Sequence, residues 1–217
     1  MLIEICSENI EIALKAQEKG AIRVELCNNL SIGGITPSYE EIEQARRQLN
    51  IGLNVLIRPR GGDFCYSAAE ISRILKDIEF CGSLITEEGK VMDGVVIGAL
   101  ARDRSIEYGA CSEMFAAACQ YGLSTTFHRA IDRSRDIFKA LEKVIDLGAD
   151  RVLTSGGAKS AFEGRDTIAQ MVQMSVGSGT LIMAGAGITP ENARQIIAET
   201  SVPEIHGSRL SLLDGFV

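Results

Sequence analysis

The stretch LNVLIRPRGGDFCYSAAEISRILKDIEF (residues 53–80) holds an apolar run, a charged loop with two glycines and an amphipathic pattern, in that order. The run LNVLIR (53–58) has the length and composition of a buried strand. Ser67 precedes Glu70 by three residues, which is the spacing of a capping box at the start of a helix. The stretch therefore predicts one strand–loop–helix unit.

The same alternation of a β-type run with a helical pattern is repeated along the chain. Eight such runs occur, at residues 2–6, 22–27, 53–58, 94–98, 124–128, 150–154, 180–185 and 202–207. Eight units in a chain of 217 residues predict a single domain, residues 1–217, with a (β/α)8 TIM-barrel-like fold. A doubly wound open sheet is the alternative, and the number of units favours the barrel.

Two segments do not fit a regular barrel. Residues 81–93 (CGSLITEEGKVMD) are typical of a loop, with a turn at Glu87, Glu88 and Gly89. Only ten residues follow the eighth run, so we expect the final helix to be short or missing. A second subunit would then cover the barrel at that point, and we therefore expect a homo-oligomer.

The composition argues against several classes of partner. The net charge is −7 and the pI is near 5, whereas a protein that binds nucleic acid needs clustered positive charge. No apolar run approaches the ~18 residues that indicate a membrane span. The N-terminal segment carries acids where a signal peptide has its basic start. We expect a cytoplasmic protein that binds neither nucleic acid nor membrane.

The cysteines show no metal-binding or redox motif in the linear sequence. The six are Cys6, Cys27, Cys65, Cys81, Cys111 and Cys119, and no two have the C-x-x-C spacing. In a reducing cytoplasm we expect free thiols, most of which would serve as small apolar side chains.

The alternation of side chains along each strand predicts which residues face the barrel interior. Helices cover the outside of a barrel, so polar residues of one parity are expected inside. This rule selects Glu4, Cys6, Arg23, Glu25, Cys27, Asn54, Leu56, Arg58, Thr126, His128, Glu204 and His206. Both histidines of the chain lie at C-terminal strand ends, where barrel active sites are built.

The first chemistry that this rim allows is anion binding. Arginine binds phosphate or carboxylate through paired hydrogen bonds, and glycine lets a backbone approach a ligand closely. Barrels commonly hold phosphate after strands seven and eight. The candidate anion-binding residues are Arg58, Arg60, Arg129, Ser155, Gly156, Gly185 and Gly187.

The second chemistry is proton transfer. Histidine exchanges a proton near neutral pH, and His128 could do so with Asp132 or Glu25. Asp63 or Asp132 would then orient the reacting groups. The candidate catalytic residues are His128, Asp63, Asp132 and Glu25.

The third chemistry is the binding of a soft metal ion. Cys6 and Cys27 end neighbouring strands with inward parity, and His206 ends the strand that borders the first one in a closed barrel. Thiolates select Cu(I) over harder ions, so these three residues are candidate ligands. Two inward cysteines are also compatible with a plain apolar core.

Six longer motifs resemble the CutC family, in the same order and over nearly the whole chain. They are RVELCNNLSIGGITPS (23–38), IRPRGGDFCYS (57–67), TFHRAID (126–132), RVLTSGG (151–157), IMAGAGI (182–188) and EIHGS (204–208). The resemblance implies a cytoplasmic TIM-barrel-like protein named for copper homeostasis. It also implies that Cys6 and Cys27 match the cysteines proposed as Cu(I) ligands in that family.

Two functions follow from the sequence. One is a CutC-like role in copper homeostasis, with Cu(I) bound by Cys6 and Cys27. The alternative is an enzyme that acts on a small phosphorylated or carboxylated metabolite. In that case His128 would transfer the proton, and Arg58 and Arg60 would clamp the anion.

Overall fold

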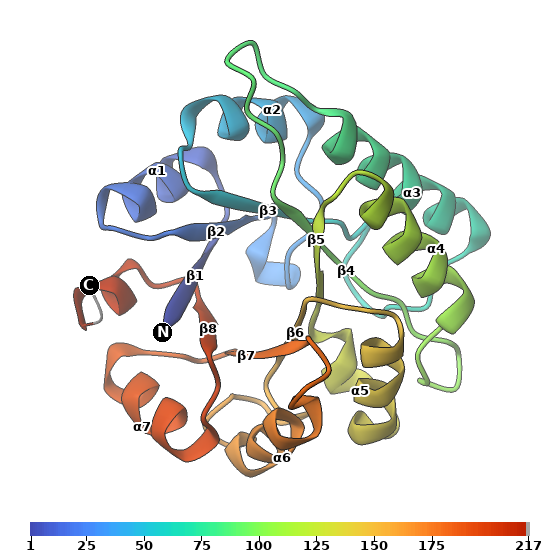
Figure 1. Ribbon diagram of the computed structural model, residues 1–217, viewed down its shortest axis with the longest axis vertical. Helices are drawn as coiled ribbons and strands as arrows, with labels where there is room; N and C mark the ends of the chain where they lie inside the picture. Colours follow the sequence, from blue (N-terminus) through green and yellow to red (C-terminus); the bar gives the residue numbers. More distant parts are fainter. Residues whose placement is uncertain (216–217) are drawn as a thin grey trace.

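Eight parallel strands form a closed barrel (Figure 1). The computed structural model describes residues 1–215. β1 pairs with β2 on one side and with β8 on the other, which closes the ring. The predicted (β/α)8 barrel is therefore confirmed, and the open-sheet alternative is wrong. The strands are β1 (Leu2–Ser7), β2 (Arg23–Leu26), β3 (Gly52–Leu56), β4 (Gly94–Ile97), β5 (Ser124–Phe127), β6 (Arg151–Thr154), β7 (Leu181–Gly185) and β8 (Glu204–Gly207).

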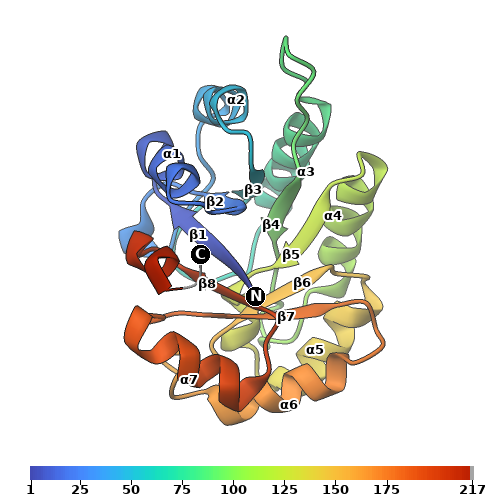
Figure 2. The ribbon, with the colours of Figure 1, turned by 60° about the vertical axis from the view of Figure 1, so that its left-hand side comes forward.

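Helices form the outer layer around the strands (Figures 1 and 2). They are α1 (Ile10–Glu18), α2 (Tyr39–Gln48), α3 (Ala68–Ser83), α4 (Tyr108–Gln120), α5 (Ile137–Asp146), α6 (Arg165–Ser175) and α7 (Pro190–Thr200). Three 3-10 helices are also present, at η1 (Leu30–Ile32), η2 (Arg129–Arg133) and η3 (Leu210–Gly215). The predicted capping box of Ser67 and Glu70 starts α3. No helix within residues 1–215 is both long and apolar enough to cross a membrane.

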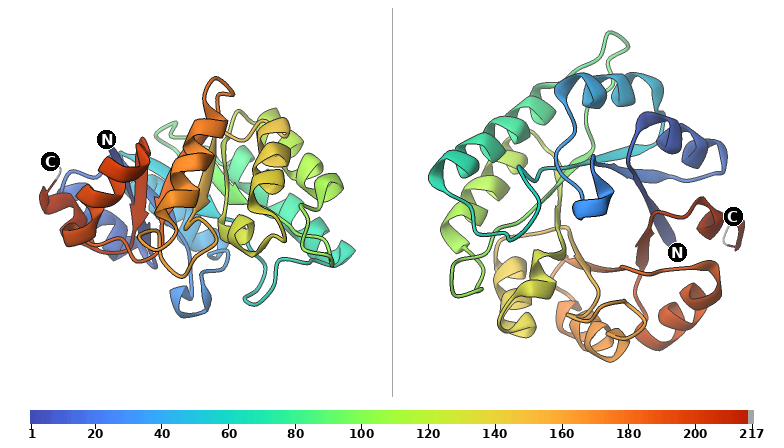
Figure 3. Two further views of the ribbon diagram at one scale, coloured as in Figure 1. Left: turned by 90° about the horizontal axis from the view of Figure 1, so that it is seen from below. Right: turned by 180° about the vertical axis from the view of Figure 1, so that it is seen from behind.

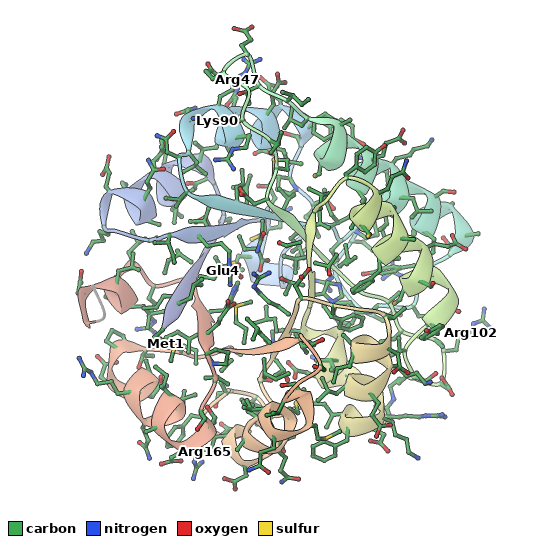
Figure 4. All side chains as sticks on the ribbon, viewed as in Figure 1. Met1, Glu4, Arg47, Lys90, Arg102 and Arg165 are labelled. Carbon is green, nitrogen blue, oxygen red and sulfur yellow. The ribbon has the colours of Figure 1, made fainter. Side chains whose placement is uncertain are left out.

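The segment 81–93 is only partly a loop. Its first three residues continue α3, because Cys81 lies on the buried face of that helix. Beyond α3 the chain forms a projecting turn, the green loop at the top of Figure 2, with an antiparallel bridge between Ile85 and Val91. The Lys90 ammonium donates a 2.7 Å hydrogen bond to the Arg47 carbonyl, and Figure 4 shows these two residues side by side. The turn is therefore attached to the end of α2.

A 3-10 helix stands where the eighth outer helix of a regular barrel would be. Within the described residues, β8 is followed only by η3, as the short final segment predicted. Leu212 and Leu213 of η3 are buried. Asp214 accepts a 2.5 Å hydrogen bond from Lys19, which lies at the end of α1. η3 therefore packs beside α1 and covers part of the gap.

The predicted alternation of side chains is confirmed. Ile5, Val24 and Val55 are fully buried in the apolar layer between strands and helices. The opposite parity fills the barrel with polar side chains: Arg23 of β2 contacts both Glu4 of β1 and Glu204 of β8. The barrel interior therefore contains an ionic layer and a small apolar cluster of Cys6, Cys27, Leu56 and Val96, and the main apolar core lies outside the strands.

Candidate functional site

A cavity of about 750 Å³ opens at the C-terminal end of the barrel. Its walls come from the ends of the strands and from the loops that follow β2, β3, β5, β7 and β8. The right-hand view of Figure 3 shows η1, in the loop after β2, lying over the barrel centre at this end. The polar side chains that line the cavity include Cys6, Glu25, Cys27, Arg58, His128 and His206.

The floor below this cavity is a network of ion pairs around Glu4, which Figure 4 labels near the barrel axis. Arg23 Nε donates to Glu4 Oε2 at 2.6 Å, and another nitrogen of the same guanidinium donates to Glu204. Asn54 Nδ2 donates to Glu4 Oε2 at 2.9 Å, and Arg151 Nε donates to Glu204 Oε2 at 3.1 Å. Each carboxylate of the floor therefore has a cationic partner.

His206 connects this floor to the cavity. Its Nδ1 lies 2.9 Å from Glu4 Oε1. Burial would raise the pKa of Glu4, but the hydrogen bond and charge of His206 and the charge of Arg23 outweigh burial and lower that pKa to about 2. Burial opposes the charged imidazole, yet the carboxylates of Glu25 and Glu4 raise the pKa of His206. The charged imidazolium–carboxylate pair is therefore favoured near neutral pH.

Glu25 is a buried carboxyl group that lines the cavity. It stands opposite Cys6 in the register of β1 and β2. Its Oε2 lies 3.7 Å from His206 Nδ1 and has no hydrogen-bond partner among the described residues. Burial raises the pKa of Glu25 to about 7; the negative charge of Glu4 adds to this, and the charges of His206 and Arg23 oppose it. Glu25 can therefore gain or lose a proton near neutral pH.

Cys6 and Cys27 lie together at the bottom of the cavity. Their sulfur atoms are 3.6 Å apart, and both side chains are buried. One ligand atom each from Cys6, Glu25 and His206 fall within 4.8 Å of one another. The hydrogen bond with Cys27, burial and the nearby Glu25 carboxylate raise the pKa of Cys6 well above the usual value. The Cys6 thiol is therefore protonated unless a cation replaces the proton.

His128 lines the cavity and has one ring nitrogen without a hydrogen-bond partner among residues 1–215. Its Nδ1 accepts a 3.3 Å hydrogen bond from the Ala130 amide, which assigns the ring proton to Nε2 in the neutral form. Nε2 is buried and has no partner in the described part of the chain. Burial and the positive charge of Arg58 lower the pKa of His128 to about 3. The neutral ring can therefore donate a hydrogen bond from its Nε2–H. It is not an imidazolium near pH 7, so it cannot act there as a general acid.

Arg58 joins two loops of the cavity wall. Its guanidinium donates to the carbonyls of Ile32 and Gly34 at 3.2 and 2.9 Å, and to the Gly62 carbonyl at 2.9 Å. It also lies 4.7 Å above the centre of the Phe64 ring. Only Nε lacks a partner among residues 1–215. Arg58 therefore shapes the pocket and has one nitrogen left for a ligand.

Arg60 and Asp63 lie apart from this cavity. Arg60 donates to Glu70 at 2.5 Å and to Asp63 at 3.0 Å, and it donates to the Cys65 carbonyl as well. These contacts tie the loop after β3 to the first turn of α3. The described lining of the 750 Å³ cavity includes neither Arg60 nor Asp63. Arg58 and Arg60 therefore do not converge on one point.

Asp132 organises the loop after β6. Its two oxygens accept hydrogen bonds from Arg129 Nε at 2.9 Å, Thr154 Oγ1 at 2.6 Å, and the amides of Ser155 and Gly157. Arg129 also donates to Ser155 Oγ at 3.0 Å. Of the predicted residues in this group, Arg129 lines the cavity, whereas Asp132, Ser155 and Gly156 are not among its described lining residues.

The two glycines predicted after β7 have different surroundings. A Cβ atom at Gly185 would meet Leu153 Cδ1 at 2.5 Å, so this glycine allows close packing between strands β6 and β7. Gly187 lines the cavity and has a positive φ of 69°, which glycine adopts without strain. Of these two glycines, only Gly187 therefore lines the cavity.

Parity along the strands did not select two arginines on the cavity rim. Arg133 ends η2 and Arg209 follows β8, and both are exposed residues that line the cavity. Arg133 forms no ion pair with another described residue. The hydrogen bond with Thr189 and, to a smaller extent, the charge of Arg209 lower the pKa of Glu191. The cluster RAIDRSR (129–135) directly after the fifth strand was the signal that could have indicated Arg133.

The fold and the cavity define a (β/α)8 barrel protein with a polar, ligand-sized pocket at its C-terminal mouth. The sequence model of the CutC family matches residues 1–211. A CutC family protein from Histophilus somni is 44% identical over 206 residues, which cover 95% of this chain and 81% of the relative. The chain therefore belongs to the CutC family, as the six motifs predicted.

Solved structures agree with this assignment. A CutC protein from Streptococcus agalactiae, provisionally named for copper homeostasis, has a TM-score of 0.87 and 34% identity. The match covers 97% of this chain and 99% of that one. Deoxyribose phosphate aldolase from Aeropyrum pernix has a TM-score of 0.68 with 16% identity, over 99% of this chain and 88% of its own. At that identity the aldolase shares the fold alone.

Proposed function

We propose that the cavity at the barrel mouth is the active site of an enzyme that moves a proton on a small phosphorylated or carboxylated metabolite. One observation carries this proposal. Glu25 Oε2, Arg58 Nε and His128 Nε2 are buried polar atoms without a hydrogen-bond partner in residues 1–215, and all three residues line the same cavity. Unpaired buried polar atoms are costly, so a ligand with matching groups is the natural partner.

The three unpaired atoms suit a carbonyl compound. The Nε2–H of neutral His128 and the Nε–H of Arg58 can donate to one or two oxygens of the ligand. Glu25 can accept a proton from the neighbouring carbon or hydroxyl group, because its pKa of about 7 matches neutral conditions. The negative charge then develops on the oxygen next to His128 and is stabilised by its N–H. Glu25 returns the proton to complete the transfer.

The acidic group of the metabolite would bind at the rim. Arg133 and Arg209 supply positive charge there, and Gly187, Gly207 and Ser208 bring backbone from the loops after β7 and β8. Barrel enzymes frequently bind phosphate at these two loops. In this proposal Glu25 transfers the proton, and Arg133 and Arg209 at the rim bind the anionic group. His128 becomes the donor to the substrate oxygen.

The experiment that tests this proposal follows hydrogen exchange from carbon. The protein is incubated in D2O with ribose 5-phosphate, glyceraldehyde 3-phosphate or pyruvate, and loss of the C–H signal next to the carbonyl is followed by NMR. We expect exchange faster than in buffer alone for at least one compound, and none above the buffer rate with Glu25→Gln.

A binding measurement accompanies the exchange experiment. The same compounds should raise the Tm of the wild type, and Arg209→Gln should reduce this shift. Glu25→Gln should keep the shift, because it leaves the anion-binding rim intact. Failure of all compounds both to exchange and to raise the Tm would contradict the proposal.

A second candidate function is Cu(I) binding, which the 3.6 Å separation of the Cys6 and Cys27 sulfurs favours. Two thiolates are suitable donors for a soft cuprous ion, and the surrounding Glu25 and Glu4 carboxylates favour a cation at this point. Cu(I) would be cargo here, consistent with the name of the solved relative. It would have to displace the thiol protons, so uptake should weaken as the pH falls.

The copper candidate is tested by anaerobic competition with a cuprous chelator. Cys6→Ser and Cys27→Ser should each abolish stoichiometric uptake. Cys119→Ser, which changes an exposed cysteine on α4, is the matched control and should bind like the wild type. Uptake by the Cys6→Ser, Cys27→Ser double variant equal to that of the parent would eliminate this candidate.

We also propose a cytoplasmic location and a homo-oligomeric state. The six cysteines, all free thiols in the described chain, are consistent with a reducing compartment. The proposed oligomer would contact the barrel beside β8, where the described residues hold the 3-10 helix η3 and no eighth outer α-helix. Light scattering of the purified protein measures the oligomeric state directly.

A further inference from the structure

A second cavity, of about 890 Å³, adjoins the first one. It lies among the loops that follow β3, β4 and β5, and its lining includes Tyr66, Leu100, Arg102 and Arg104. Gly62, Phe64 and Arg133 line both cavities. The two spaces are therefore separated by a single shared wall, and Arg133 can reach a ligand in either one.

The lining of the second cavity holds three arginines and two carboxylates, Asp63 and Glu70, and both carboxylates are paired with Arg60. The segments 102–104 and 129–135 contain five arginines and two aspartates. Both aspartates are already paired: Asp103 binds Arg135 at 2.6 Å, and Asp132 binds Arg129 at 2.9 Å. This pairing leaves Arg102, Arg104 and Arg133 without an ion pair to any residue that the structure describes.

Backbone contacts join the loops that carry these arginines. The Leu100 amide donates to the Phe64 carbonyl at 2.9 Å, which joins the loop after β4 to the loop after β3. The Arg135 amide donates to the Arg104 carbonyl at 3.0 Å, which joins it to the loop after β5. Arg104 also adopts a positive φ of 63°, an uncommon conformation for a residue with a side chain. The three loops that line the cavity are thus joined to one another.

The local charge is opposite to the charge of the whole protein. The chain has a net charge of −7, yet three unpaired guanidinium groups gather at one side of the mouth. Such a patch attracts anions while the rest of the surface repels them. The apolar part of the lining, from Phe64 and Leu100, suits a ligand with a carbon skeleton more than a free inorganic ion.

We infer that the second cavity is a second anion subsite, and that the ligand is an elongated metabolite with an anionic group at each end. One group binds at the rim by Arg209 and the loops after β7 and β8, and the other binds near Arg102 and Arg104. Arg133 lies between the two groups. This inference rests on the proposed function of the first cavity and specifies its substrate class as bis-anionic.

The test compares two probes that differ by one phosphate group. Fructose 6-phosphate and fructose 1,6-bisphosphate are titrated into the protein by calorimetry at constant ionic strength. We expect the bisphosphate to bind at least tenfold more tightly. Arg102→Gln and Arg104→Gln should each remove most of this advantage and leave the affinity for the monophosphate unchanged.

The control removes one arginine charge at a site far from both cavities. Arg47→Gln removes an exposed arginine of α2, and Figure 4 shows Arg47 and Arg102 at different edges of the molecule. It should change neither affinity. Equal affinity of the two probes, or a bisphosphate advantage that survives in the Arg102→Gln, Arg104→Gln double variant, would overturn the second subsite while monophosphate binding still supports the first cavity. Binding of neither probe would count against both proposals.

Discussion

A glutamate in the floor of the barrel and a glutamate in the mouth above it have different hydrogen-bond partners and different pKa values. Glu4 and Glu25 lie on neighbouring strands, both point inward and both are buried. Glu4 accepts hydrogen bonds from Arg23 and Asn54 and contacts His206, and its pKa falls to about 2. Glu25 has an oxygen without a partner in residues 1–215, and its pKa rises to about 7.

The difference lies in the partners, since burial is nearly the same for both. Burial raises the pKa of each carboxyl group, and only the one with cationic partners overcomes that effect. A satisfied ionic floor fixes the shape of the barrel, whereas unsatisfied groups in the mouth are free to interact with a ligand. The following predictions test whether the two regions divide stability and function in this way.

The largest expected effect comes from removing the central cation of the floor. Arg23→Ala leaves Glu4 and Glu204 buried without their main partner, which should lower the free energy of unfolding by about 3–5 kcal/mol. Urea denaturation measures the loss. Arg47→Ala, which breaks the exposed pair with Glu43, should cost no more than ~1 kcal/mol. A cost for Arg23→Ala as small as that of the control would refute the stabilising role of the floor.

The second prediction concerns pH and Glu25. Because its pKa is raised from 4.5 unfolded to about 7 folded, the folded state keeps a proton that the unfolded state has already lost. The contribution of Glu25 to stability should therefore fall as the pH rises from 4.5 to 7 and stay low above it. Glu25→Gln should remove this fall and so gain about 2–3 kcal/mol at pH 8, but almost nothing at pH 4.

Urea unfolding at several pH values checks the Glu25 prediction. The groups that face this carboxyl are His206, Glu4 and Arg23. Because Glu25 itself helps to raise the pKa of His206, the profile of the variant also contains the change in that histidine. Glu113→Gln, at an exposed position of α4, is a matched substitution away from them and should show the wild-type profile. If Glu25→Gln also followed that profile, Glu25 would not be a strained carboxyl group.

His128 should have a smaller effect at neutral pH. Its pKa of about 3 lies below the unfolded value of 6.5, so its contribution to stability is complete above pH 6.5 and is lost as the pH falls towards 3. His128→Gln should cost about 1–2 kcal/mol at pH 7, from one hydrogen bond and altered packing.

The chain has two histidines, so NMR can check the His128 prediction directly. The His206 signal should titrate above pH 6.5, and the His128 signal should not change between pH 5 and 9. His128→Gln assigns the two signals by removing one. A His128 signal that titrates near pH 6.5 would contradict the neutral donor that the proposed mechanism needs.

The sequence was sufficient to predict the barrel and the face of each strand side chain. Period-two alternation placed Glu4, Arg23 and Glu204 inside, and the strand register brings them together. Parity selects a face but not a partner, so it could not separate Glu4 from Glu25. The difference between their pKa values depends on which layer of the barrel interior each carboxyl group occupies and on the charged side chains next to it there.

Loop residues were harder to place, because parity ends with the strand. Arg58 and Arg60 are two residues apart and were expected to act together, but one turns to the loop after β2 and the other to α3. Arg133 is six residues beyond the end of β5 at Phe127, and only the geometry of η2 brings it to the rim. Local hydrogen bonds determine where these loop side chains lie, and the periodicity of the sequence cannot predict those hydrogen bonds.

The smallest expected effect on stability should accompany a large effect on binding. Arg133 is exposed and has no ion pair within the described residues, so Arg133→Gln should change the free energy of unfolding by no more than ~0.5 kcal/mol. Its guanidinium lines both cavities, so the affinity for fructose 1,6-bisphosphate should fall by at least tenfold. Urea unfolding and calorimetry on one preparation measure the two quantities together. A variant that loses stability but keeps its affinity would place Arg133 with the floor, and the separation between a stabilising floor and a ligand-binding mouth would not hold at this residue.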